Sequence, residues 1–428
     1  MRVGVEPAVR VLCRSPTGEL VEDVVKAIAV VGAGTMGAGI AQLAAKCGCV
    51  VHLIDVDDEV LRQSISAISK RFDRSVEKGR MTASERDDAV ARIKPAKTIE
   101  NLADVGLAIE AVVEDIDVKH KVFTQLAQAT PATAVLATNT SSLSVSRIAE
   151  SVSDPTRVVG MHFFNPAPVM ALVEVIAGEK SSSASVDAAC EVAKAWGKVP
   201  VRAKDTPGFI VNRVARGFYL EALRLLGEGV AGVDEIDLVM KTHGRFRMGP
   251  FELMDLVGLD VNLAVSTSVW EQMDRHPRFT PHEIQQTLVA AGHLGRKTGR
   301  GFYSYDGDHA LPAYTVERRS FHLDPKLRDI TTIFAMKAGA ILANSTEQLV
   351  FCRILGAVLN EAGAAYTEGV ASASDIDTAM QKGTNYPKGP LAWSDEIGHR
   401  NVRGLLKSLD ADAGDGRYAP ARLFADAE

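Results

Sequence analysis

The segment Lys26–Cys47 reads KAIAVVGAGTMGAGIAQLAAKC, and this stretch decides the fold of the chain. Its opening residues, KAIAVV, are uninterrupted and rich in β-branched side chains, which is typical of a central parallel strand. Glycines follow with the spacing GxGxxG, at Gly32, Gly34 and Gly37, and a run of good helix formers comes next. We expect Gly32 to permit the turn, Gly34 to let the backbone approach a pyrophosphate, and Gly37 to let the helix pack closely on the strand.

Thr35 and Met36 lie between these glycines at the start of the predicted helix, where unpaired backbone N–H groups and the helix dipole favour a phosphate. A second apolar strand, Cys49–Ile54, follows this helix and ends at Asp55, at the distance from the glycine motif where a ribose-binding acid is expected. A carboxylate at this place accepts hydrogen bonds from both ribose hydroxyls and repels a 2′-phosphate, which favours NAD over NADP. A turn of the same shape that binds no nucleotide is the alternative.

The uncharged stretch from Ala27 to Ala45 is about long enough for a membrane span. A strand, a glycine turn and a buried helix explain its clustered glycines better. The N-terminal residues 1–25 carry acids early and have no continuous apolar run, so they do not resemble a signal peptide. We therefore expect no membrane segment and no membrane partner.

Further apolar strands alternate with polar helical segments along the first half of the chain. Such alternation predicts an α/β Rossmann domain with a doubly wound, mostly parallel sheet. The predicted strands are Leu107–Val113, Ala134–Thr138, Arg157–His162 and Leu172–Ile176, and the predicted helices are Asp57–Arg80 and Asp117–Ala129.

Composition agrees with an ordinary globular protein. The 428 residues are 46% hydrophobic and 24% charged, and 48 basic against 54 acidic side chains leave a net charge of -6. A nucleic-acid-binding protein usually shows a basic excess or stripe, so we expect no nucleic-acid partner. The five scattered cysteines fit the reducing cytoplasm better than a disulfide framework. No Cys or His spacing indicates a metal site.

Polar residues gather where the later strands end, which is where open α/β sheets bind ligands. One such group begins with Asn139 and Ser141, and another contains His162 and Asn165. The next strand carries Glu174 inside the apolar run LVEVI, where an unpaired charge is costly. We expect His162 to pair with Glu174 and to act as a base of near-neutral pKa in an NAD-linked alcohol oxidation. A purely structural His–Glu pair is the alternative.

The strings GAGTMGAGIA, NTSSLS, MHFFNPAPVMALVEVI and TPGFIVNR, in this order, resemble the NAD-dependent L-3-hydroxyacyl-CoA dehydrogenase family. The resemblance covers about residues 26–305 and then the C-terminal segment. It implies reversible oxidation of an (S)-3-hydroxyacyl-CoA to the 3-oxoacyl-CoA, as in the β-oxidation of fatty acids. The chain also resembles long bacterial members of the family that have a duplicated helical module, and some of these act on 3-hydroxyadipyl-CoA.

By this resemblance, His162 is the catalytic base, Glu174 orients it, Ser141 bonds the substrate, and Asn212 helps to hold the substrate oxygen. The resemblance also implies cofactor contacts. Asp55 would bind the adenine ribose and Glu114 and Lys119 would lie near the nicotinamide ribose, while Asn139, Asn165 and Lys297 are further cofactor candidates.

The phosphates of CoA call for basic side chains beside the acyl site. The predicted helix Ser66–Arg80 is basic, and helical spacing puts Arg71 and Lys78 on a common face. We name these two as candidate substrate contacts, with Lys78 preferred. A merely solvated basic face is the alternative.

Beyond the Pro–Gly pair at residues 207–208 the pattern becomes helical, and the helical module occurs twice. The segment 213–258 aligns with the segment 353–398 without a gap, and 14 of the 46 aligned positions are identical. The second copy has Cys352 where the first has Asn212, so it hosts no second active site. We expect it to cover the apolar surface of the first copy as a pseudo-dimer within one chain. A module with its own partner, or a homo-oligomer, is the alternative.

The expected organisation is therefore an N-terminal extension, a Rossmann domain, and an all-α domain with a partial tandem repeat. The ranges are 1–25 for the extension, 26–207 for the NAD-binding domain, 208–305 for the helical domain, 306–347 for a linker with one apolar helix, and 348–428 for the second copy. Two rival functions remain: an NAD-dependent dehydrogenase of a free hydroxy (sugar) acid, and a non-catalytic NAD-binding scaffold.

Overall fold

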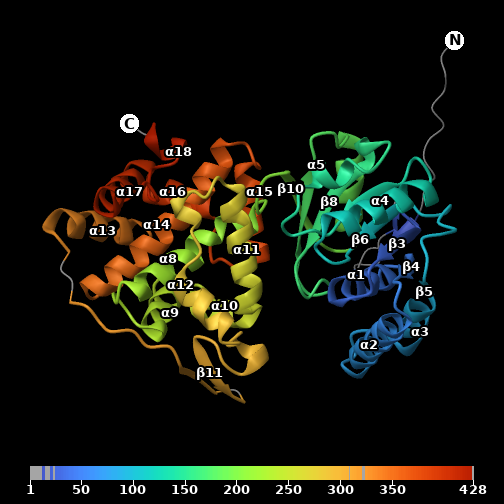
Figure 1. Ribbon diagram of the computed structural model, residues 1–428, viewed down its shortest axis with the longest axis horizontal. Helices are drawn as coiled ribbons and strands as arrows, with labels where there is room; N and C mark the ends of the chain where they lie inside the picture. The colour runs from blue at the N-terminus through green and yellow to red at the C-terminus, as the bar shows by residue number, and fades with distance from the viewer. Residues whose placement is uncertain (1–11, 15–19, 23–24, 308, 321–322, 427–428) are drawn as a thin grey trace, which may run out of the picture. The chain divides into compact units, whose positions relative to one another are not determined.

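The computed structural model describes residues 12–14, 20–22, 25–307, 309–320 and 323–426. Most of the predicted N-terminal extension therefore lies outside the described residues, apart from the paired strands β1 (Leu12–Arg14) and β2 (Leu20–Glu22). The chain forms two compact units, Met1–Asp205 and Thr206–Glu428 (Figure 1). Each unit is described by itself below.

The first unit is built on a sheet of eight strands in the order β10-β9-β8-β7-β6-β3-β4-β5. Neighbouring strands are parallel except for the pair β8 and β9. Strands β9 and β10 therefore run opposite to the other six. The predicted doubly wound, mostly parallel sheet is confirmed. The strands are β3 (Ala27–Val31), β4 (Val50–Ile54), β5 (Ile93–Ala96), β6 (Leu107–Glu110), β7 (Val135–Thr138), β8 (Val158–Phe163), β9 (Leu172–Ala177) and β10 (Val199–Lys204).

Helices alternate with these strands and bury their apolar faces against the sheet or against one another. α2 shows the helical pattern clearly, because Leu61, Ser64, Ile68 and Phe72 are its buried residues. Its N-cap is Asp57, whose side chain accepts hydrogen bonds from two backbone N–H groups of the first turn. The helices are α1 (Thr35–Lys46), α2 (Asp58–Glu77), α3 (Ala83–Ala91), α4 (Ile116–Ala129), α5 (Val145–Ala149) and α6 (Ser183–Ala195), with a 3₁₀ turn at Pro155–Arg157.

The uncharged stretch from Ala27 to Ala45 is divided between β3 and α1 by the glycine turn, as expected for a nucleotide-binding unit rather than a membrane span. Of the described helices, only α14 (Ser345–Thr367) is by itself long and apolar enough to cross a bilayer. Some 89% of its most apolar window is buried inside the protein, as in the core helix of a globular domain.

The second unit is helical apart from a small β hairpin. Its first part contains α7 (Val211–Val214), α8 (Arg216–Gly227), α9 (Val233–Thr242), α10 (Pro250–Val257), α11 (Leu259–Gln272), α12 (Glu283–Ala290), 3₁₀ turns at Pro277–Phe279 and Arg296–Thr298, β11 (Tyr303–Asp306) and β12 (His309–Pro312). Its second part contains α13 (Pro325–Lys337), α14 (Ser345–Thr367), α15 (Ala373–Gly383), α16 (Pro390–Ile397), α17 (His399–Ala413) and α18 (Arg422–Ala425).

The two parts of this unit carry the same helices in the same places. In the gap-free alignment of the two copies, the first residues of α9, α10 and α11 are equivalent to those of α15, α16 and α17, and the last residue of α8 is equivalent to that of α14. α8 packs along α14 (Figure 1). Asp237 and its equivalent Asp377 each accept two backbone N–H groups at the start of α10 and α16, so the shared aspartate has the same capping task in both copies.

One helix differs from the expectation. The apolar string at 331–343 suggested a helix over the whole stretch, but α13 starts earlier, at Pro325, and ends at Lys337. Asp324 caps its start, and Gly339, with a φ of 82°, lies just beyond its end. A left-handed glycine at this place terminates a helix, which the apolar pattern alone did not reveal.

Candidate active site

The glycine turn between β3 and α1 forms the floor of the candidate nucleotide site. Gly32 has a φ of 99°, and a β carbon on it would lie 2.5 Å from the carbonyl oxygen of Ala111. A β carbon on Gly37 would lie 1.8 Å from the carbonyl oxygen of Gly32. Gly34 has no neighbouring atom within 4 Å of such a β carbon, because it faces open space. The turn therefore has the close packing at two glycines and the open cradle at the third that a pyrophosphate requires.

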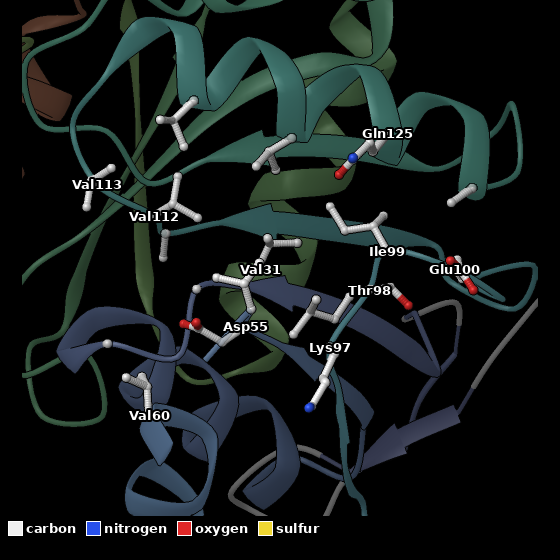
Figure 2. A pocket seen from close by; sticks show the side chains of 18 of the residues that line it. Val31, Asp55, Val60, Lys97, Thr98, Ile99, Glu100, Val112, Val113 and Gln125 are labelled. Carbon is white, nitrogen blue, oxygen red and sulfur yellow. The ribbon is translucent and has the colours of Figure 1, made fainter. Parts of the chain in front are cut away.

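A pocket of about 1120 Å³ opens beside this turn, where β3, β4 and β6 end. Figure 2 shows Asp55 and Val60 on one side of this pocket and Gln125 of α4 on the other. Five of the predicted cofactor residues line it, namely Gly32, Gly34, Thr35, Met36 and Asp55. Its walls are mostly apolar with a few polar groups, which is typical of a cofactor site.

The carboxylate of Asp55 is held firmly in this pocket. Its Oδ2 accepts a hydrogen bond from the backbone N–H of Ala33 at 2.8 Å, and its Oδ1 accepts one from the backbone N–H of Asp57 at 3.0 Å. A carboxylate fixed in this way stays in place to receive ribose hydroxyls and opposes a phosphate at the same position.

Sequence reasoning missed one wall of the pocket. The segment that follows β5 contributes Lys97, Thr98, Ile99, Glu100 and Asn101. No recognisable motif marks this segment, and only the position of β5 beside β4 at the edge of the sheet brings it to the pocket.

Glu114 organises the loop that carries Ser141. Its Oε1 accepts hydrogen bonds from the backbone N–H groups of Ser141 and Ser142, both at 3.1 Å, and from the hydroxyl groups of Thr140 and Ser142. Burial opposes ionisation of this carboxyl, but Lys119 and the two hydroxyl donors outweigh it and hold the pKa of Glu114 below its usual value. The ionised carboxylate therefore fixes the conformation of the Ser141 loop.

Lys119 is only 1% exposed and is paired with two acids. Its Nζ lies 2.7 Å from Oε1 of Glu110 and 3.2 Å from Oε2 of Glu114. Glu110, at the end of β6, also accepts a hydrogen bond from the hydroxyl of Thr138 at 2.7 Å. Sequence reasoning missed Glu110, although an acid that ends the apolar strand LAIE is a visible signal of a buried polar contact.

His162 and Glu174 face each other across neighbouring strands. They are direct register partners in the antiparallel pair β8 and β9, and the Nδ1 of His162 lies 2.7 Å from Oε2 of Glu174. Glu174 is fully buried, and the side chain of His162 is 8% exposed. The contact commits Nδ1 to the carboxylate and holds the imidazole ring in one orientation.

Asn139 connects the Ser141 loop to the strand of His162. Its Oδ1 accepts a hydrogen bond from the backbone N–H of Phe163 at 2.9 Å. The ring of Phe164 lies 4.5 Å from the ring of His162. In the first unit the structure thus brings together the His–Glu pair, the Ser141 loop and the residues that hold both.

The remaining predicted residues are placed as follows. Asn165 is exposed and is followed by a cis peptide bond to Pro166. Arg71 donates a hydrogen bond to Gln42 at 3.0 Å, and Lys78 is the exposed C-cap residue of α2. In the second unit, Asn212 lies in α7, and Lys297 binds both carboxylate oxygens of Asp260 at 2.6 and 2.7 Å.

Comparison with known proteins gives two matching family models. A model described as the NAD binding domain of 3-hydroxyacyl-CoA dehydrogenase matches residues 27–206. A model described as the C-terminal domain of 3-hydroxyacyl-CoA dehydrogenase matches residues 208–305 and again 350–427. The chain therefore carries one copy of the first domain and two matches to the second.

Individual proteins agree with these models. The 3-hydroxyadipyl-CoA dehydrogenase of Escherichia coli (strain K12) is 38% identical, over 94% of this chain and 97% of its own length. The crystal structure of 3-hydroxybutyryl-CoA dehydrogenase from Escherichia coli K12 is 36% identical with a TM-score of 0.83, covering 94% of this chain and 98% of that one. The (S)-3-hydroxybutyryl-CoA dehydrogenase from Ralstonia eutropha is 39% identical with a TM-score of 0.64, covering 66% and 99%.

Proposed function

The chain belongs to the 3-hydroxyacyl-CoA dehydrogenase family, and from this premise we propose that it catalyses the reversible, NAD-dependent oxidation of an (S)-3-hydroxyacyl-CoA to the 3-oxoacyl-CoA. The observation that carries the proposal is the 2.7 Å contact between His162 and the fully buried Glu174, in the unit that holds the nucleotide pocket. A base with an oriented imidazole is what alcohol oxidation requires of the protein.

His162 acts as the base at Nε2 and takes the proton of the substrate hydroxyl group. Glu174 keeps the ring in one orientation and stabilises the imidazolium that forms, because its carboxylate has no access to water. NAD, when bound, accepts the hydride from C3 of the substrate. In the reverse direction the imidazolium returns its proton to the substrate oxygen. A positioned base of this kind contributes about 10²–10⁴-fold to the rate.

The residues of the first unit fit NAD. Gly32 and Gly34 form the cradle for the pyrophosphate, Thr35 and Met36 present the N-terminus of α1, and Asp55 receives the adenine ribose. By resemblance to the family, we also assign Glu114 and Lys119 to the nicotinamide ribose, Asn165 and Lys297 to the nicotinamide end, and Asn139 to cofactor binding. The contacts of Glu114 and Asn139 support this assignment, because Glu114 holds the Ser141 loop and Asn139 connects that loop to the strand of His162.

On the substrate side, Ser141 and Asn212 bond the oxygen atoms of the acyl group. Lys78 and Arg71 are the proposed contacts of the CoA phosphates. Lys78 is the stronger candidate of the two, because it is exposed while Arg71 already donates a hydrogen bond to Gln42. The names of the relatives include substrates with and without a terminal carboxylate, so both kinds belong in the test.

The second helical copy takes the place of a partner subunit in this proposal. Phe218 and Phe246 of the first copy pack against Tyr386 of the second at 5.7 and 4.9 Å, and Phe246 also lies 6.1 Å from Trp393. Aromatic side chains of both copies therefore pack in one shared core, and the second copy is an integral part of the helical unit.

The test is NADH formation by the purified protein with (S)-3-hydroxybutyryl-CoA, longer homologues, 3-hydroxyadipyl-CoA and the matching free acids. His162→Gln and Glu174→Gln should each lower kcat by about 10²–10⁴-fold on the thioesters while NAD still binds. His120→Gln is the matched control, because His120 lies in the same unit and its ring contacts a backbone carbonyl oxygen, that of Arg147, rather than a carboxylate.

Turnover of the free acids alone would replace the thioester with a free hydroxy acid as substrate. Full activity of His162→Gln would remove the proposed base. A protein that binds NAD but turns over none of these substrates would be the non-catalytic scaffold.

A further inference from the structure

Asn212 is followed in α7 by an arginine that is held by the second helical copy. Arg213 is 1% exposed, and its Nε lies 2.5 Å from Oε1 of Glu361. Its Nη1 lies 2.7 Å from Oε2 of Glu368. Glu361 lies in α14, which is the main helix of the second copy, and Glu368 is the C-cap residue of that helix. The residue next to a proposed substrate ligand is thus anchored by side chains that lie far away in the sequence.

A single helical turn depends on such anchors. α7 spans four residues, Val211–Val214, and a helix of this length has almost no stability of its own. Burial opposes the charge on Arg213, but Glu361 and Glu368 outweigh it and raise the pKa of the guanidinium. The ionised pair therefore sets where the α7 backbone lies.

The same contact exists in reverse, with the roles of the copies exchanged. Arg353 is the equivalent of Arg213. Its Nη2 lies 2.6 Å from Oε1 of Glu221 and 3.1 Å from Oε1 of Glu228. Glu221 and Glu228 are the first-copy equivalents of Glu361 and Glu368 in the alignment of the two copies. This reciprocity is what an isologous interface produces.

Only one half of this reciprocal network lies next to a residue with a proposed task. The neighbour of Arg353 is Cys352, which is fully buried and contacts the carbonyl oxygen of Thr331 at 3.4 Å. The difference continues along the helix, because Arg216 donates from Nε to the backbone oxygen of Asn212 at 2.9 Å, whereas its equivalent is Gly356.

Arg216 supplies a second anchor for Asn212, from within the first copy. Its Nη1 donates to the hydroxyl of Ser266 in α11 at 2.7 Å. The equivalent of Ser266 in the second copy is Leu406. The second copy keeps the arginine ion pair but lacks this additional hydrogen-bonded support, because Gly356 and Leu406 stand at the positions of Arg216 and Ser266.

We propose that Glu361 and Glu368 of the second helical copy are positioning residues for the reaction, which hold Asn212 in its working place through Arg213. The inference rests on the proposed substrate contact of Asn212. The second copy then does more than cover an apolar surface, because its carboxylates set the geometry of a group that binds the substrate. A displacement of about 1 Å at such a group lowers a rate by up to about 10²-fold.

The chain offers its own matched control for the test. In the full-length protein, Glu361→Gln should lower kcat/KM for the hydroxyacyl-CoA by about tenfold or more and leave the KM for NAD unchanged. Glu221→Gln removes the equivalent buried carboxylate, which pairs with Arg353 next to Cys352. It should leave kcat/KM within about twofold of wild type, although Glu361 and Glu221 each pair with two arginines and the two substitutions are therefore alike in structural cost.

A second pair of variants covers the case in which the buried substitutions unfold the protein. The side chains of Glu368 and Glu228 are 48% and 40% exposed, so the chain should fold without either carboxylate. Glu368→Gln should lower kcat/KM by about threefold, and Glu228→Gln should leave it unchanged.

The deciding comparison adds Asn212→Ala. If Glu361 acts through Asn212, then Glu361→Gln should cause almost no further loss in the Asn212→Ala background. Equal losses from Glu361→Gln and Glu221→Gln, or an undiminished loss in that background, would show a structural role only and overturn the inference. If Asn212→Ala lowers activity but neither Glu361→Gln nor Glu368→Gln does, the inference fails while the substrate role of Asn212 stands. An Asn212→Ala protein with full activity would remove that role and the inference together.

Discussion

Gly217 and Ala357 lie against each other where α8 crosses α14, so closely that a β carbon on Gly217 would come within 2.8 Å of the carbonyl carbon of Ala357. The two residues occupy equivalent positions in the alignment of the two helical copies. The helices thus cross at their equivalent points, as two subunits do at the axis of a symmetric dimer.

Gly217→Ala should lower the stability of the helical unit by about 1–3 kcal/mol, because the added methyl group meets backbone atoms that have no alternative rotamer. Gly404→Ala in α17 is the control, since a β carbon there meets no atom within 4 Å. It should raise stability by about 0.5–1 kcal/mol through the better helix propensity of alanine. Unfolding in urea measures both changes, and a Gly217→Ala protein as stable as Gly404→Ala would contradict the close crossing.

Asp55→Asn should raise the KM for NAD by about tenfold and narrow the preference for NAD over NADP, because the fixed negative charge at the proposed adenine-ribose contact is lost. Glu100→Gln is the matched control, since it neutralises another acid of the same pocket that no ribose contact is assigned to. Steady-state kinetics with both cofactors measures the effect. An unchanged cofactor preference in Asp55→Asn would show that another residue excludes the 2′-phosphate.

The contribution of Asp237 to the free energy of unfolding of the helical unit should fall as the pH rises from about 4 to 7. Burial raises the pKa of this carboxyl to about 7, against two backbone N–H groups and the hydroxyl of Tyr303 that favour the ionised form. The folded state therefore holds a proton that the unfolded state releases near pH 4, and this contribution is lost as the pH approaches 7. The free energy of unfolding of the wild type, minus that of Asp237→Asn, should therefore fall between about pH 4 and pH 7 when both proteins are unfolded in urea at a series of pH values.

Asp260→Asn is the control for this pH profile. Burial of Asp260 is outweighed by its hydrogen bond to Lys297, which lowers the pKa of the carboxyl. Its contribution therefore changes only below the ordinary aspartate pKa, and the difference from wild type should be flat between pH 4 and 7. A flat profile for Asp237→Asn as well would show that Asp237 is ionised throughout in the folded protein.

Deletion of residues 346–428 should leave a protein that dimerises or aggregates. The deletion removes Tyr386 and Trp393 from Phe218 and Phe246, and it exposes the side of α8 that α14 covers. An exposed apolar surface of this kind promotes self-association or aggregation. Size-exclusion chromatography with light scattering, beside the full-length chain, measures the outcome. A monodisperse monomer would mean that the first copy needs no partner.

Local signals explain which parts of the fold could be predicted. The strand, the glycine turn and the helix at 26–47 lie next to one another in the sequence, so their pattern alone specifies the turn. Glu174 was identifiable because an acid inside an apolar run needs a partner, and the structure makes it the register partner of His162.

The edge strands could not be predicted in this way. β5 and β10 form the two edges of the sheet, and they contain Pro95 and Pro200 together with charged residues. An edge strand is paired on one side only and tolerates proline, so its sequence looks like a loop. The pocket wall that follows β5 was missed for the same reason.

The surroundings of the predicted site residues depend on contacts distant in the sequence. Lys119 lies in the polar string EDIDVK, which is typical of a solvated helix start, yet the residue is buried between Glu110 and Glu114. Lys297 is likewise engaged by Asp260, 37 positions earlier in the chain. The packing of the folded chain determines which acid pairs with each lysine. The local sequence pattern does not indicate that acid.

The reciprocal ion pairs between the two helical copies have a genetic consequence. In a homodimer, one gene encodes both sides of the interface, so every substitution there appears twice and must suit both. Here each side has its own codons, and a change at Glu361 leaves Glu221 untouched. The carboxylates that pair with Arg213 and those that pair with Arg353 can therefore change independently of one another, and so can the neighbouring residues Asn212 and Cys352.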